Sequence, residues 1–80
     1  MAEEIDVNQT LDTKGQSCPI PILKTKRAID GMGKDQILKV LTTDPGSQKD
    51  MPAWANRTGN VILKVEEGPG VFTFYIQKTA

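Results

Sequence analysis

The sequence is 80 residues long, with ten basic and ten acidic side chains, one cysteine and no histidine. One cysteine excludes an internal disulfide and the lack of histidine excludes the familiar zinc sites, so we expect neither a metal nor a cofactor. The balanced charge argues against nucleic acid as a direct ligand, and no apolar run approaches the roughly 18 residues of a membrane span. We therefore expect a single domain over residues 1–80. A free thiol suits a reducing compartment, so we expect this domain in the cytoplasm.

The first part of the chain predicts a strand, a loop and a helix. Apolar and polar residues alternate weakly over residues 5–11, which predicts a strand. Residues 12–17 then form a loop that turns at Gly15. Apolar residues recur at helical spacing over residues 19–32, and glycines follow, which predicts a first helix.

A central strand and a second helix come next. Residues 36–42 are nearly continuous apolar sequence, which suits a central strand. Ser47, with Asp50 three residues on, resembles a capping box that opens a helix, and Gly59 is a good end for it. Because Pro52 removes a backbone donor, we expect either a kink there or a helix that starts near Asp50.

The last part of the chain predicts a hairpin. Two alternating segments, 61–66 and 71–77, flank the turn sequence Gly68-Pro69-Gly70 and indicate two antiparallel strands. The order is therefore β-α-β-α-β-β. Two helices cannot cover both faces of a sheet this small, so we expect a two-layer α/β sandwich with both helices on one face.

Cys18 is the candidate reactive residue, because it lies where the first helix begins. Unpaired backbone N–H groups and the helix dipole favour the thiolate there, and the thiolate is the reactive form. Pro19 and Pro21 suit a first helical turn and, with Gly15 behind them, would hold the cysteine in one orientation. An isolated cysteine is commonly a buried small hydrophobe. The polar residues before Cys18 nevertheless favour a reactive thiol.

Two aspartates near the second helix have a structural and a functional interpretation. Asp44 and Asp50 cap that helix in the first. In the second, either carboxylate orients the loop before Cys18 or contacts a partner.

Four basic residues and one aromatic residue also have a structural and a functional interpretation. Lys14, Lys24, Lys26 and Arg27 are ordinary solvated side chains or a basic rim that steers an acidic partner. Trp54 is a core residue of the second helix or, if exposed, an interface anchor.

The composition limits the chemistry of Cys18. Without histidine there is no nucleophile–base pair of the protease type, and without a second cysteine there is no dithiol cycle. Such a thiol can still accept a sulfur atom as a persulfide and pass it on.

Three segments together resemble the TusA (SirA-like) sulfur-carrier family. They are Leu11-Asp12-Thr13-Lys14-Gly15-Gln16-Ser17-Cys18-Pro19-Ile20-Pro21, Thr43-Asp44-Pro45-Gly46-Ser47 and Lys49-Asp50-Met51-Pro52. The resemblance implies a mixed four-stranded sheet, and a cysteine at position 18 that receives sulfane sulfur and gives it to an acceptor sulfurtransferase. It implies a cysteine desulfurase or a rhodanese-like protein as donor. The onward pathway would be tRNA thiolation, molybdenum-cofactor sulfuration or sulfur oxidation.

Other function classes stay open at this point. One alternative is a non-catalytic regulatory module that binds RNA or a protein. If its ligand is RNA, the binding would depend on salt concentration. A thiol enzyme with its own turnover would consume peroxide catalytically, although no resolving cysteine is present. Because a carrier must expose Cys18, we expect a monomer when the protein is free.

Overall fold

The computed structural model describes residues 7–17 and 20–79. The elements follow the predicted order: β1 (Gln9–Thr13), α1 (Ile20–Asp30), β2 (Ile37–Thr42), α2 (Ser47–Thr58), β3 (Val61–Gly68) and β4 (Val71–Gln77). The longer helix has 12 residues, and none of the described helices is long and apolar enough to cross a membrane.

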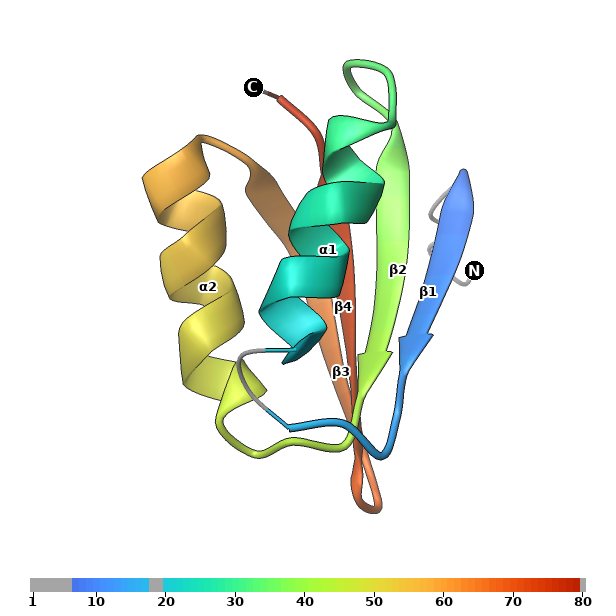
Figure 1. Cartoon of the computed structure of the whole chain (residues 1–80), viewed down its shortest axis with the longest axis vertical. Helices are drawn as coiled ribbons and strands as arrows, with labels where there is room; N and C mark the ends of the chain where they lie inside the picture. The colour runs from blue at the N-terminus through green and yellow to red at the C-terminus, as the bar shows by residue number, and fades with distance from the viewer. Residues whose placement is uncertain (1–6, 18–19, 80) are drawn as a thin grey trace, which may run out of the picture.

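The strands form one mixed sheet in the order β1-β2-β4-β3. β1 pairs with β2 in parallel, whereas β4 pairs antiparallel with both β2 and β3. Both helices lie on the same face of this sheet (Figure 1). The predicted two-layer α/β sandwich is therefore confirmed.

The core lies between the helices and the covered face of the sheet. Period-two alternation places every second residue of β2 and β4 on that face, where apolar side chains pack against the helices. The buried apolar residues are Ile29, Met32, Leu38, Val40, Met51, Trp54, Ala55, Phe74 and Ile76. Trp54 is only 4% exposed, so its interpretation as a core residue is the correct one.

The first strand is shifted relative to its prediction. β1 runs to Thr13, so two residues that we expected in the loop belong to the strand, and Ile5 lies outside the described residues. Thr13 pairs with Thr42, is fully buried, and donates its hydroxyl to the carbonyl of Leu41 at 2.6 Å. Because its hydroxyl is hydrogen-bonded, Thr13 can be buried within the strand, although its polar side chain favoured a loop.

The helix ends also differ in detail. α1 ends at Asp30 rather than at Met32, because the backbone then tightens: the N–H of Met32 donates to Ile29 at 3.0 Å. α2 begins at Ser47 and continues through Pro52, so a start near Asp50 was wrong. Pro52 is exposed, which leaves water free to reach the carbonyl that has lost its donor.

The capping box at the start of α2 is not formed. The N-cap is Gly46, and no side chain caps the helix. The Ser47 hydroxyl is fully buried and lies 3.3 Å from the hydroxyl of Thr42, so it joins the helix to β2 instead.

Strand β3 carries an irregularity that alters its faces. The pairing with β4 shifts between Ile62 and Lys64, which places Ile62 opposite Ile76 and Val65 opposite Phe74. Such a bulge disrupts strict alternation. The apolar residues Val61, Leu63 and Val65 are 43% to 45% exposed, and Ile62 is the one packed against the core. Val65 is exposed although it pairs with the buried Phe74, because β3 is an edge strand of the sheet.

Candidate functional site

The loop that leads from β1 into α1 is held against the loop between β2 and α2. The two connections lie at the same end of the molecule (Figure 1). The backbone N–H of Gly15 donates to the Thr43 hydroxyl at 2.9 Å, across 28 residues of sequence. Gly15 has a φ of +82°, a conformation that other residues adopt only with strain. The turn predicted at Gly15 is therefore present, and the hydrogen bond to Thr43 holds it in place.

The start of α1 is anchored from inside the protein. Pro21 is fully buried, and its carbonyl accepts a 2.7 Å hydrogen bond from the hydroxyl of Thr25, which is also buried. The N–H of Ile20 donates to the carbonyl of Ser17 at 3.0 Å. The two residues between them, Cys18 and Pro19, lie outside the described residues.

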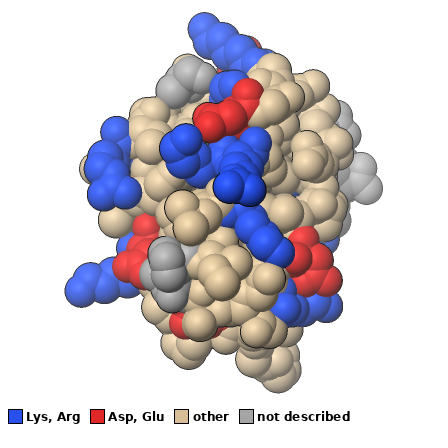
Figure 2. All heavy atoms as spheres, in the orientation of Figure 1, with Lys and Arg blue, Asp and Glu red and all other residues tan. Residues whose placement is uncertain are grey.

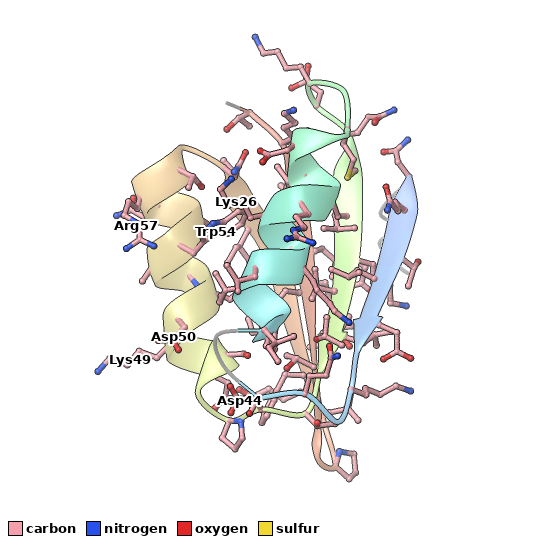
Figure 3. All side chains as sticks on the ribbon, viewed as in Figure 1. Lys26, Asp44, Lys49, Asp50, Trp54 and Arg57 are labelled. Atoms are coloured by element: carbon pink, nitrogen blue, oxygen red, sulfur yellow. The ribbon has the colours of Figure 1, made fainter. Side chains whose placement is uncertain are left out.

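Asp44 shapes the turn before α2 but does not cap the helix. Its N–H donates to the Thr42 hydroxyl and its Oδ1 accepts from the N–H of Gly46, both at 3.2 Å. The predicted cap is therefore corrected to a side-chain turn that precedes the helix. Asp50 is partly buried in the first turn of α2, where a carboxylate is favourable to the helix dipole. Figure 3 shows both aspartates at the end of the molecule where α1 starts.

Basic side chains gather over the helical layer (Figure 2). Lys26 pairs with Asp30 at 3.1 Å, and Lys14, on the loop, lies 3.7 Å from Asp12. Lys24 and Arg27 are exposed and form no ion pair with a described residue. The candidate basic rim therefore has two unneutralised charges on α1.

Two exposed apolar residues at the start of α1 were not anticipated. Ile20 is 41% exposed and Leu23 is 53% exposed, three residues apart on one side of the helix. The signal was present in the sequence, because neither fits the core stripe formed by Thr25 and Ile29. Apolar surface beside charged surface is typical of a protein interface.

Among the described residues, no group of three or more metal-ligating side chains comes together. The sequence model of the family described as Sulfurtransferase TusA matches residues 9–78. The chain belongs to this TusA family.

Individual relatives agree with this assignment over their whole length. A putative sulfur carrier protein of Halobacterium salinarum is 46% identical over 80 residues, which are 99% of each chain. The sulfur carrier protein TusA of Allochromatium vinosum is 45% identical over 74 residues, 92% of this chain and 97% of that one. The crystal structure of a SirA-like protein from Desulfitobacterium hafniense superimposes with a TM-score of 0.77 at 27% identity, covering 90% of this chain and 99% of that one.

Among the described residues of this TusA-family chain, the acid–base groups with a shifted pKa, Glu66 and Tyr75, lie on strands β3 and β4. Tyr75 donates its hydroxyl to Glu66 Oε1 at 2.7 Å, on the face of the sheet that no helix covers. This hydrogen bond lowers the pKa of Glu66, with Lys64 acting in the same direction, and it raises the pKa of Tyr75. The Lys39 ammonium lies 5.7 Å from the centre of the Tyr75 ring. The cluster ties three strands together.

A Tyr75→Phe variant should lose the stability that the ionised Glu66 carboxylate gains from its hydrogen bond with Tyr75. The folded-state pKa of Glu66 is below its ordinary value of 4.5, so the stabilisation is present above that value and is lost as the pH falls through the folded pKa. In the variant we expect the Glu66 pKa to rise toward 4.5, and the stability difference from wild type to shrink on acidification. Carboxyl NMR titration and urea unfolding at several acid pH values measure the two effects. An unchanged Glu66 titration would contradict the assigned cause.

Proposed function

We propose that this TusA-family chain is a sulfur carrier whose Cys18 holds one sulfane sulfur and delivers it to an acceptor protein. The observation that carries the proposal is the loop before Cys18: the Gly15–Thr43 bond and the buried Pro21 fix both sides of the only thiol in the chain. The relatives named sulfur carriers match over nearly the full chain, which supports the same conclusion.

The proposed transfer needs no net redox change in either step. The Cys18 thiolate attacks the terminal sulfur of a donor persulfide, a new S–S bond forms on Cys18, and the donor leaves as a thiolate. An acceptor thiolate then attacks the outer sulfur and Cys18 leaves as a thiolate. The first-turn N–H groups of α1 would stabilise the anionic sulfur in both steps.

We further propose how the partners dock. The exposed Ile20 and Leu23, with the unneutralised Lys24 and Arg27, form a surface on α1 that suits an acidic partner with an apolar centre. The donor would be a cysteine desulfurase or a rhodanese-like protein, and the acceptor a sulfurtransferase. The onward pathway is tRNA thiolation, molybdenum-cofactor sulfuration or sulfur oxidation. In this proposal the chain is one domain of residues 1–80 and a cytoplasmic monomer when free.

The test is the intact mass of the protein after incubation with a cysteine desulfurase and cysteine, or with thiosulfate or tetrathionate. We expect a gain of one sulfur from the persulfide donor, removed by reductant and mapped to the peptide that contains Cys18. An adduct from thiosulfate or tetrathionate alone would assign the protein to sulfur oxidation. No adduct from any donor, together with a Cys18 that does not react with alkylating reagents, would overturn the proposal.

Reversing the charge on α1 should slow loading without blocking it. We expect the double variant Lys24→Glu/Arg27→Glu to accept sulfur from its protein donor roughly tenfold more slowly at low salt, because steering by the basic surface is lost. Mass spectrometry of samples quenched at successive times, at several salt concentrations, measures the loading rate and its salt dependence. The double variant Lys34→Glu/Arg57→Glu is the matched control, since it makes the same change in net charge at two exposed residues, on the loop after α1 and in the last turn of α2. An equal loss in the control would exclude a specific surface.

A further inference from the structure

A pocket of about 190 Å³ opens between the last turns of the two helices. α1 provides Lys26, Ile29 and Asp30, and α2 provides Trp54 and Thr58. Asn60, just before β3, and Lys78, just after β4, complete the lining. Figure 3 shows Lys26 and Trp54 near one another between the helices, whereas Lys49 lies at the opposite end of α2. The pocket is thus remote from the start of α1 and from the proposed carrier site.

The two lysines of the pocket have hydrogen-bond donors left over, beside the acceptors of the Asp30 carboxylate. The Thr58 hydroxyl already donates to the Trp54 carbonyl at 2.9 Å and accepts from the Asn60 amide at 2.9 Å. Lys78 uses one N–H on the Met32 carbonyl at 2.8 Å, and Lys26 uses one on Asp30 at 3.1 Å. An ammonium has three donors, so each lysine retains two.

The charge of the lining has the same sign as its spare donors. Two lysines face one aspartate, which leaves one net positive charge. Lys78 donates to the carbonyl of Met32, just beyond the end of α1, so its positive charge lies where the helix dipole is negative and partly offsets it. Ile29 and Trp54, both nearly fully buried, provide an apolar wall beside these cations.

The size of the pocket limits its occupant. At about 190 Å³ the pocket is smaller than the roughly 300–1,000 Å³ of sites that hold drug-sized ligands, so its occupant is a small molecule. We propose that this pocket binds a small organic monoanion whose carboxylate or similar oxyanion accepts from Lys26 and Lys78, while a short apolar part contacts Ile29 and Trp54. This inference does not rest on the proposed sulfur-carrier function, because it uses neither the loop before Cys18 nor the proposed docking residues Ile20, Leu23, Lys24 and Arg27.

Butyrate is a suitable probe, since it has six heavy atoms, one charge and an apolar tail. Trp54 is the only tryptophan in the chain, so its fluorescence and its indole N–H signal report on the pocket directly. We expect a saturable change on titration with sodium butyrate in the millimolar range. Sodium chloride at matched ionic strength and the neutral analogue butyramide should give none.

Substitutions in the lining provide the decisive comparison. Lys26→Gln should weaken butyrate binding about tenfold, and Lys78→Gln by at least as much, while Asp30→Asn should strengthen it by removing the opposing charge. Lys49→Gln is the matched control and should leave binding unchanged. If Lys78→Gln fails to fold, Lys26→Gln still tests the inference, because its ion pair is on the surface. A response that does not saturate, that is equal for butyramide, or that weakens equally in Lys49→Gln would overturn it.

Discussion

A Cys18→Ser variant is expected to take up no sulfur from any donor, with loading at least 100-fold below that of the wild-type protein. A serine hydroxyl is not ionised near neutral pH, and it cannot form the S–S bond that holds the cargo. Serine is otherwise a near-isosteric replacement, so the fold should persist. Intact mass after incubation with donor gives the loading, and urea unfolding gives the stability of the same sample.

Ser17→Ala is the matched control for this substitution. Ser17 is exposed, and its backbone carbonyl, which the substitution keeps, accepts the bond from Ile20. The control should therefore load sulfur at the wild-type level. Undiminished loading of Cys18→Ser would show that another group accepts the sulfur. A loss of stability in Cys18→Ser by several kcal/mol would instead assign the thiol to the core.

The candidate site was predictable where it depends on local backbone rules. Gly15 was identified as a turn residue, and its positive φ is the reason that glycine suits the position. Pro21 was expected in the first turn of α1, where it is observed. The bond from Gly15 to Thr43 was not predictable, because it depends on the register of two strands that are remote in sequence. The same applies to Asp44, whose carboxylate binds the N–H of Gly46 before α2 rather than capping the helix.

The fold followed from periodicity, and the errors in predicting the strands have one common cause. Apolar alternation identified β2 and the hairpin, and helical spacing identified both helices, because these elements bury one face each. The end of β1 was missed since the hydroxyl of the buried Thr13 bonds to a carbonyl of the neighbouring strand. The bulge between Ile62 and Lys64, which interrupts the alternation of β3, was missed because it is a feature of the pairing with β4. Both features are determined by pairing between strands, which a single segment does not encode.

Phe74→Ala is expected to lower the free energy of unfolding by about 3–5 kcal/mol. Phe74 is fully buried on β4, the strand that pairs with β2 on one side and β3 on the other, and it lies opposite Val40 and Val65. Truncation removes the apolar contacts of the ring and leaves a cavity between the sheet and the helices. A small domain has about 5–15 kcal/mol of total stability, so this loss would leave much of the variant near its unfolding transition.

Phe72→Ala makes the same chemical change two residues away on the same face of β4. Phe72 is only partly buried at the margin of the core, so its loss should be clearly smaller. Urea unfolding followed by Trp54 fluorescence measures both variants, because Trp54 lies in the same core. Equal losses at the two positions would mean that the core is not centred on Phe74. A larger loss for Phe74→Ala with an unchanged urea dependence would locate the stability of the fold in the contact between the helices and the middle of β4.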